Sequence, residues 1–177
     1  MIKKITILFS VLLASCIQNS ESKNNYLDYS SKEDKLSGGV KIIQIQTPSG
    51  KFNVWTKRIG NNPTKKVLLL HGGPGFDHQY FQAADSYFPK ESIEYYYYDQ
   101  LGSNKSDNPK DESLWTIDRF VNEVEQVRQA LNLNKDNFIL LGHSWGGILG
   151  IEYALKYQNN LKALIISNMV PSIPDYI

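Results

Sequence analysis

The sequence predicts an α/β protein with a mostly parallel sheet that opens with an antiparallel hairpin. Three observations support this. Short apolar segments without polar alternation recur along the chain, as in strands that are buried on both faces. Segments with helical periodicity lie between them, as in layered α/β domains. Glycine-rich turns follow two of the apolar segments, where strands would end at the functional edge of such a sheet.

The first half of the sheet can be read in chain order. Residues 40–46 alternate apolar and polar side chains, and 51–57 follow after the turn-like segment 47–50, so together they predict the hairpin. The apolar segments 67–70 and 93–98 predict two buried strands. The second contains four consecutive tyrosines, which we interpret as core packing rather than as an aromatic binding site.

The second half begins with a helix that Thr116 could cap and that runs to about Leu131. Its apolar residues share one face: Ile117, Phe120, Val121, Val124, Val127 and Leu131. Its polar residues Glu123, Glu125, Arg128 and Gln129 lie off that face. Residues 138–141 then predict a strand, 148–157 a helix and 161–167 the last strand, which completes the alternation.

Composition excludes several classes of protein. The chain has 177 residues, a formal net charge of +1, 21% charged and 41% hydrophobic residues, which argues against collagen-like, disordered and multi-span membrane proteins. The near-neutral balance argues against nucleic acid as a partner. One cysteine excludes a disulfide framework, and three scattered histidines form no zinc-ligand pattern, so we expect no metal.

The amino terminus reads as an export signal. Lys3 and Lys4 precede an apolar run over residues 5–14, which is too short to span a bilayer comfortably, so residues 1–15 predict a signal peptide. The segment 13–16, Leu-Ala-Ser-Cys, resembles the bacterial lipobox, which implies cleavage before Cys16 and lipidation of that residue. The alternative is a buried cysteine after an ordinary signal peptide.

The domain organisation follows from this signal. Residues 16–39 are rich in Ser, Asn, Lys, Glu and Asp, which predicts a polar tether between the lipid anchor and the folded domain. Residues 40–177 form the folded part. We therefore expect an exported protein of the bacterial cell envelope that is attached to a membrane through lipid on Cys16.

The turn after strand 138–141 carries a candidate nucleophile. Residues 142–147 read Gly-His-Ser-Trp-Gly-Gly, which contains G-x-S-x-G between a predicted strand and a predicted helix. The glycines allow a sharp turn that lifts the Ser144 hydroxyl above the sheet, next to the positive end of the helix dipole. The alternatives are a turn that serves packing only or a phosphate cradle, although the sequence contains neither G-x-G-x-x-G nor G-x-x-x-x-G-K-[ST].

The turn after strand 67–70 carries a candidate oxyanion-binding loop. Residues 71–75 read His-Gly-Gly-Pro-Gly, and in esterase-type hydrolases an N–H of this loop joins the N–H of the residue after the serine. Gly73 and Trp145 are then the expected donors. We expect none of the three histidines to act as a general base. His71 should fix the loop, and His143 should project away from the serine. His78 should lie at the surface or at the pocket rim.

These motifs together resemble those of the proline iminopeptidase (prolyl aminopeptidase) family of α/β-hydrolases. The resemblance rests on residues 71–75, on 99–106 (Asp-Gln-Leu-Gly-Ser-Asn-Lys-Ser) and on 142–147, in this order. One departure is Asn-Lys at positions 104–105, where the family often has Gly-Arg. The resemblance implies that Ser144 forms an acyl-enzyme while releasing an N-terminal proline, or a similar residue, from a small peptide or amide, with no cofactor or metal.

The sequence does not supply a complete catalytic triad of serine, acid and histidine. In this fold the acid and then the histidine follow the serine along the chain, but no histidine follows Ser144, and Asp175 comes just after the last predicted strand, where the family enters its cap. We therefore expect an α/β-hydrolase domain truncated before its cap and final strands, inactive alone. The strand 161–167 would then form an exposed, aggregation-prone edge.

Two alternatives to the aminopeptidase remain open. The first is an esterase, amidase or lactonase of the same fold, because no residue can be matched to the cap that selects the substrate. The second is a catalytically inactive lipoprotein that binds peptides. A nucleotide-binding module is less favoured, because neither glycine-rich turn has phosphate-binding spacing.

Overall fold

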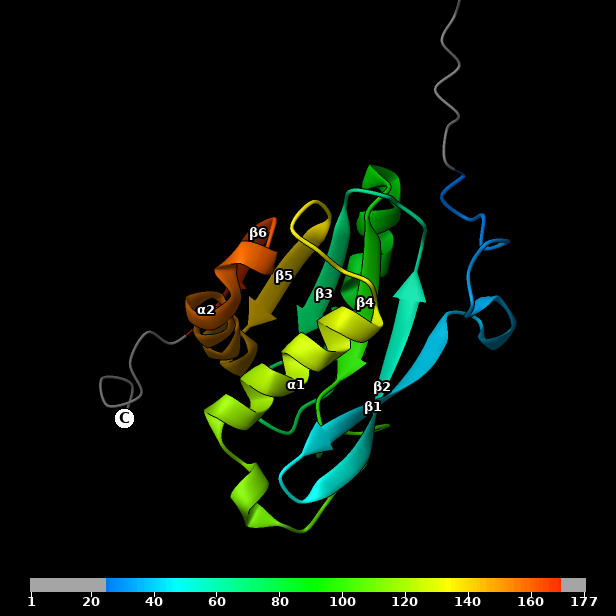
Figure 1. Ribbon diagram of the computed structural model, residues 1–177. Helices are drawn as coiled ribbons and strands as arrows, with labels where there is room; N and C mark the ends of the chain where they lie inside the picture. Colours follow the sequence, from blue (N-terminus) through cyan, green and yellow to red (C-terminus); the bar gives the residue numbers. More distant parts are fainter. Residues whose placement is uncertain (1–24, 170–177) are drawn as a thin grey trace, which may run out of the picture.

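The computed structural model describes residues 25–169 and has at its centre a six-stranded sheet with the order β1-β2-β4-β3-β5-β6 (Figure 1). The strands are β1 (Val40–Thr47), β2 (Gly50–Ile59), β3 (Lys66–Leu70), β4 (Glu94–Asp99), β5 (Phe138–His143) and β6 (Ala163–Ser167). The helices are α1 (Ile117–Ala130) and α2 (Trp145–Tyr157), with short 3₁₀ helices η1 (Lys35–Ser37), η2 (Gln79–Ser86), η3 (Phe88–Glu91), η4 (Glu112–Leu114) and η5 (Gln158–Asn160).

The strand pairing confirms the predicted fold class. β1 and β2 form an antiparallel hairpin, and β2 pairs antiparallel with β4. From β4 onward, β4, β3, β5 and β6 are parallel neighbours. The carboxyl ends of β3, β4 and β5 therefore share one edge of the sheet, where the loops that follow them can meet.

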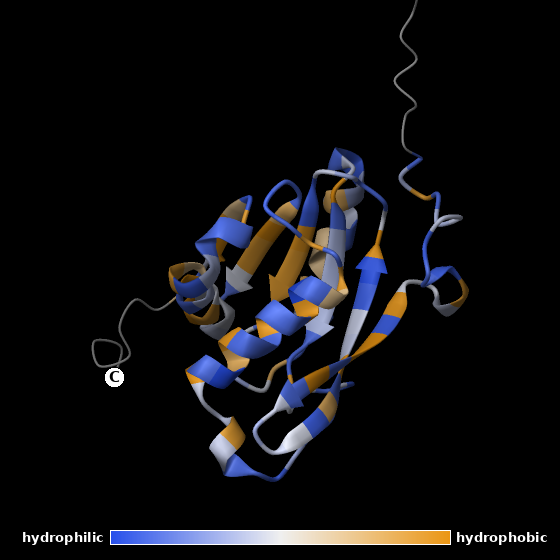
Figure 2. Cartoon of the chain, viewed as in Figure 1, coloured by the Kyte–Doolittle hydropathy of each residue, from blue (hydrophilic) through white to orange (hydrophobic). Residues whose placement is uncertain are grey.

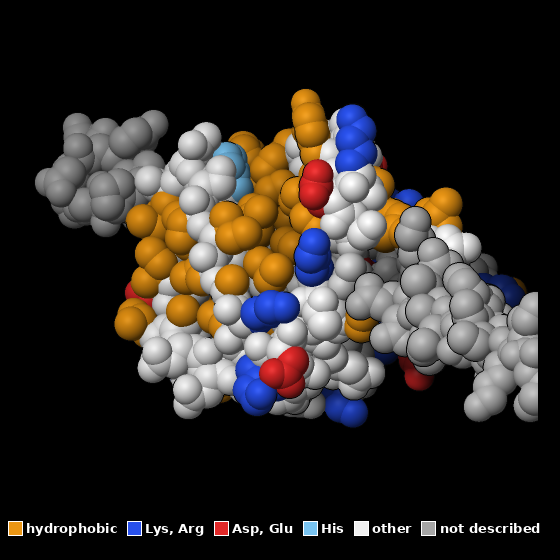
Figure 3. All heavy atoms as spheres, turned by 90° about the horizontal axis from the view of Figure 1, so that it is seen from above, with side chains coloured by type: hydrophobic (Ala, Val, Ile, Leu, Met, Phe, Trp, Pro, Cys, Tyr) orange, Lys and Arg blue, Asp and Glu red, His pale blue; other side chains and the backbone are white. Residues whose placement is uncertain are grey.

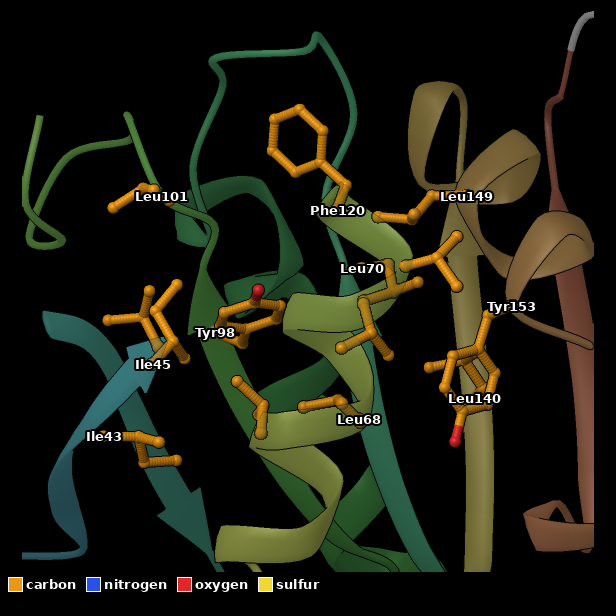
Figure 4. Packing of buried hydrophobic residues seen from close by; sticks show 14 of the residues in the cluster. Ile43, Ile45, Leu68, Leu70, Tyr98, Leu101, Phe120, Leu140, Leu149 and Tyr153 are labelled. Atoms are coloured by element: carbon orange, nitrogen blue, oxygen red, sulfur yellow. The ribbon is translucent and has the colours of Figure 1, made fainter. Parts of the chain in front are cut away.

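Both faces of the central strands are covered, which explains their unbroken apolar sequence. Leu68 and Leu70 of β3 pack with Tyr98 of β4 on the side of α1 and α2 (Figure 4). Val67 and Leu69 pack on the opposite side, together with Tyr95 and Tyr97 of β4 and aromatic residues of η2 and η3. All four consecutive tyrosines are buried, so the interpretation of this segment as core is confirmed.

Helix α1 has the predicted cap but a more polar buried side than its periodicity indicates. Thr116 Oγ1 accepts a hydrogen bond from the Arg119 N–H at 3.3 Å, as expected for an N-cap. Hydrophobic and hydrophilic residues alternate along the helix in Figure 2. Glu123 is nevertheless buried, because its carboxylate accepts from the Leu101 N–H at 2.9 Å and pairs with Arg119. Partners that are distant in sequence thus determine which polar residues of α1 are buried.

Helix α2 begins at Trp145, three positions before the start predicted from the sequence. The glycines at 146 and 147 have low intrinsic helix propensity, so they appeared to belong to the preceding turn. In the structure they form the first turn of the helix and pack closely against neighbouring strands. The helix therefore starts directly after Ser144.

From Asn25 onward, the polar segment predicted as a tether makes contacts with the domain. The Tyr26 hydroxyl donates to the Ile93 carbonyl at 3.0 Å, and Asp34 forms an ion pair with the buried Arg58 at 2.5 Å. The predicted signal peptide and Cys16 lie outside the described residues. Among the helices of residues 25–169, none is both long and apolar enough to cross a bilayer.

Strand β6 lies at one edge of the sheet, next to β5. Its Ile165 and Ile166 side chains are 44% and 37% exposed, and Leu155 of the neighbouring α2 is 73% exposed. Hydrophobic side chains also gather on the face of the molecule seen in Figure 3. Within residues 25–169, the predicted last strand is thus an edge strand with exposed apolar side chains.

Candidate active site

Ser144 occupies a sharp turn between β5 and α2, the position predicted for a nucleophile. Its backbone has φ 54° and ψ −122°, a conformation that is costly for a non-glycine residue and that concentrates at functional sites. The Ser144 N–H donates to the Ser167 carbonyl at 3.0 Å, and the Ser144 carbonyl accepts from the Gly147 N–H at 2.8 Å. The Ser144 side chain forms no capping hydrogen bond with α2, which leaves its hydroxyl available.

The two glycines that flank this serine are required by close backbone contacts. A Cβ on Gly142 would lie 2.1 Å from the Gly146 carbonyl oxygen. A Cβ on Gly146 would lie 2.1 Å from the Leu70 carbonyl oxygen. The G-x-S-x-G pattern therefore reflects the crowding that the sequence predicts, and it also brings the start of α2 against the end of β3.

The loop after β3 lies directly beside the serine. A Cβ on Gly72 would be 3.0 Å from Ser144 Cβ and 3.4 Å from Ser144 Oγ, so only a residue without a side chain leaves this approach open. The Gly72 N–H donates to the Tyr80 hydroxyl at 2.7 Å. Gly73, the next residue, has φ +112°, which only glycine adopts at low cost.

The two predicted oxyanion donors belong to these adjoining turns. The Trp145 N–H is at the amino terminus of α2, where backbone N–H groups have no partner within the helix. Among the hydrogen bonds of residues 25–169, none uses the N–H of Gly73 or of Trp145. The structure thus brings both donors to the turns beside Ser144, and their role in binding an oxyanion stays a prediction.

His71 is held as a neutral structural residue. It is fully buried, its Nε2 accepts from the Gln100 N–H at 3.0 Å, and its Nδ1 therefore carries the proton that it donates to the Gly72 carbonyl at 2.9 Å. Burial lowers the pKa of the His71 imidazole, which also favours the neutral form. These contacts agree with the interpretation that His71 fixes the loop.

The prediction for His78 is wrong. Its side chain is buried rather than at the surface or the pocket rim, because Nδ1 lies 2.7 Å from Asp99 Oδ1 and the ring packs on Trp55 and Tyr97. Asp99 also accepts from the His78 N–H at 3.0 Å. His78 thus anchors the far end of the loop that begins at His71.

The third histidine, His143, belongs to the elbow, the sharp turn of residues 142–147, and packs against aromatic side chains. Its ring centroid lies 5.1 Å from that of Tyr80 and 6.3 Å from that of Phe81. Among the described residues, no histidine or carboxylate forms a hydrogen bond with Ser144 Oγ, and no group of three or more His, Cys, Asp or Glu could hold a metal ion. The described residues therefore place the predicted nucleophile and the predicted donors together, without a general base in contact with Ser144 Oγ.

An apolar hollow of about 470 Å³ borders both turns, a size in the usual range of small-molecule sites. The loop of residues 71–75 contributes Pro74 and Gly75, and the elbow contributes Trp145. The remaining lining residues are Leu101, Gly102, Trp115, Ile117 and Phe120. In the described part of the chain, none of the lining residues is titratable, so this lining favours a neutral, apolar group.

Two contacts of this site could not be assigned from the sequence. Tyr80 holds the Gly72 N–H, and Gln100 contacts both the loop and Trp145. Gln100 belongs to the segment 99–106 that carries the family resemblance, which marked the segment but not the role of this residue. No sequence motif marked Tyr80, because an aromatic residue in a loop is most often a packing residue.

Comparison with known proteins agrees with this geometry. The family described as alpha/beta hydrolase fold matches residues 65–175. A proline iminopeptidase of Chitinophaga pinensis is 67% identical over 131 residues, which is 74% of this chain and 44% of that protein. A proline iminopeptidase of Flavobacterium johnsoniae is 62% identical over 135 residues, which is 76% of this chain and 46% of that protein.

A solved structure shows the same architecture. The proline iminopeptidase of Mycobacterium smegmatis superposes with a TM-score of 0.66 at 27% sequence identity, over 77% of this chain and 46% of that one. The resemblance to proline iminopeptidases and the fold class are therefore confirmed. The chain spans less than half the length of the curated relatives that it matches.

Proposed function

This chain belongs to the alpha/beta hydrolase fold family, and on this premise we propose that it is the nucleophile-bearing part of a serine aminopeptidase. The substrate would be a small peptide or amide with an N-terminal proline or a similar residue. The observation that carries the proposal is the positive φ of Ser144 in a strand-to-helix elbow, with Gly72 against its side chain. Relatives named proline iminopeptidase support the substrate class.

The proposed reaction uses the groups described above. Ser144 Oγ attacks the carbonyl carbon of the N-terminal residue, and the proton of the hydroxyl passes to a histidine supplied outside the described residues. The N–H groups of Gly73 and Trp145 stabilise the oxyanion. The peptide bond breaks, the amine leaves with a proton, and water hydrolyses the resulting ester of Ser144. The apolar hollow would hold the ring or side chain of the released residue.

The test is hydrolysis of proline-4-nitroanilide by the complete gene product that contains this chain. We expect release of nitroaniline, and a loss of at least about 10³-fold in kcat for Ser144→Ala, as is typical for a lost nucleophile. Acetyl-proline-4-nitroanilide is the matched control substrate, because an aminopeptidase requires the free amine. Equal turnover of the acetylated substrate, or an unchanged rate in Ser144→Ala, would exclude the aminopeptidase.

One observation favours the second candidate, an esterase, amidase or lactonase. Within residues 25–169, the residues that line the hollow include no acidic side chain that could hold a substrate amine. Hydrolysis of 4-nitrophenyl acetate but not of proline-4-nitroanilide, lost in Ser144→Ala, would support this alternative. Binding of peptides without hydrolysis of either substrate would instead support the inactive peptide-binding lipoprotein.

We further propose that the protein is exported and attached to the bacterial cell envelope through lipid on Cys16. The support is the sequence over residues 1–16. Cells given radiolabelled palmitate should incorporate label into the unaltered protein and not into Cys16→Ser. Label that persists in the variant would place the lipid elsewhere, and absence of label from both would exclude the anchor.

A further inference from the structure

The turns that carry Gly73 and Trp145 are joined by the buried side chain of Gln100, which directly follows β4. Its Nε2 donates to the His71 carbonyl at 3.0 Å, and its Oε1 accepts from the Trp145 indole Nε1–H at 3.2 Å. Its backbone N–H donates to His71 Nε2 at 3.0 Å. Gln100 therefore contacts the residue that begins the loop of Gly73 and the residue that carries the second donor.

The sheet order makes this bridge possible. β3 lies between β4 and β5, so the loop after β3 separates Gln100 from the elbow after β5. Gln100 is 29 residues from His71 and 45 residues from Trp145 in the sequence. With 1% of its surface exposed, it is shielded from water that could replace these contacts.

The chemistry of the two partners suits an amide side chain. The indole N–H of Trp145 only donates, and the carbonyl of His71 only accepts, so the bridging side chain must accept at one atom and donate at another. This requirement also fixes the orientation of the Gln100 amide. A carboxylate of the same length would accept from Trp145 but would repel the His71 carbonyl, and an apolar side chain would contact neither.

We propose that Gln100 is a positioning residue that sets the distance between the two oxyanion donors. The inference rests on the proposed function, because the Gly73 and Trp145 N–H groups matter only if an oxyanion forms. Such donors act over 2.7–3.1 Å, and displacement by about 1 Å can cost about 10²-fold in rate. Gln100 would act on the transition state through these donors without touching the substrate.

The first variant is Gln100→Met in the complete gene product, assayed with proline-4-nitroanilide and 4-nitrophenyl acetate. We expect kcat to fall about 10- to 100-fold while KM changes less than about threefold, because oxyanion donors act on the transition state. The matched control is Gln126→Met. The Gln126 amide also donates at one atom and accepts at the other, but these contacts are with backbone groups of Gln46, and it joins α1 to β1 away from the site.

The second variant, Gln100→Glu, separates positioning from a purely structural role. When the introduced carboxyl group is protonated, its O–H can donate to the His71 carbonyl and its other oxygen can accept from Trp145, whereas the ionised form cannot donate. The ratio of variant to unaltered kcat should therefore rise as the pH falls from 9 to 6. In Gln100→Met the same ratio should stay constant over this range.

The outcomes distinguish the two proposals. If the unaltered protein hydrolyses only 4-nitrophenyl acetate, the aminopeptidase proposal is wrong. The role of Gln100 is then tested by the kcat values for that ester. If it hydrolyses neither substrate, both proposals fall. Should Gln100→Met keep its kcat while unfolding at lower denaturant, or should the Gln100→Glu ratio be independent of pH, Gln100 is structural only and the inference is overturned.

Discussion

The two turns of the candidate site lie side by side but are held in different ways. In the elbow, backbone contacts decide the shape: a Cβ on Gly142 or on Gly146 would lie 2.1 Å from a carbonyl oxygen. In the loop of residues 71–75, hydrogen bonds with Gln100 and Tyr80 hold His71 and Gly72, and the closest contact that an added Cβ would make is within the loop, 2.7 Å from Gly73 to the Gly75 nitrogen. Steric contact, including contact with β3, therefore shapes the elbow, whereas side-chain hydrogen bonds connect the loop to neighbouring elements.

This difference has consequences for how each turn fails. A steric structure tolerates no added atom, but it responds little to pH or to the loss of one polar contact. A hydrogen-bonded loop keeps its fold when one contact is lost, but its donors shift and the reaction slows. Substitutions in the elbow should therefore act on stability, and substitutions around the loop should act on rate and on pH dependence.

The largest effect is expected for Gly146→Ala, which tests the steric side of the comparison. The added methyl group would collide with the Leu70 carbonyl and push α2 away from β3. We expect the free energy of unfolding to fall by about 3 kcal/mol, the upper range for overpacking, as measured by urea denaturation. The control is Gly38→Ala, where φ is +65° and nothing lies within 4 Å, so the loss should be about 1 kcal/mol. Equal losses would contradict the steric account.

An intermediate effect is expected from pH, acting through His71. Burial lowers its pKa in the folded state, so below its ordinary pKa of about 6.5 the unfolded chain binds a proton that the folded chain does not. The contribution of His71 to the free energy of unfolding is therefore fully present above about pH 6.5. It declines below that pH, by at most about 1.4 kcal/mol per pH unit. Denaturation of His71→Gln at pH 7.5 and 5.5 should show a smaller decline. An identical decline in both proteins would assign the pH dependence to other groups.

The smallest effect is expected for Tyr80→Phe, which removes the hydroxyl that accepts from the Gly72 N–H. The lost hydrogen bond corresponds to about 1 kcal/mol, so we expect kcat to fall at most about fivefold and the free energy of unfolding to fall by at most about 1 kcal/mol. Tyr87→Phe is the control, because Tyr87 is a neighbouring tyrosine with 68% exposure and its hydroxyl makes no hydrogen bond among residues 25–169. If both variants lose the same activity, the Tyr80 contact does not hold the loop.

Much of the fold could be predicted because its signals are local. Residues 67–70 and 138–141 read as buried strands, and the structure extends them only to Lys66 and His143. The placement of polar groups could not be predicted in the same way. His78 and Glu123 are buried because partners distant in sequence, Asp99 and the backbone of Leu101, satisfy them, and no periodicity encodes that pairing.

The sequence by itself determined the alternation of strands and helices, the elbow around Ser144 and the glycine loop beside it, because each depends on side-chain size and backbone freedom within a few residues. Only the tertiary structure decided how these turns meet. The strand order places β3 between β4 and β5, which lets Gln100 contact both His71 and Trp145. Contacts of this kind join residues that are close only after the sheet has formed, so they cannot be read from the order of residues along the chain.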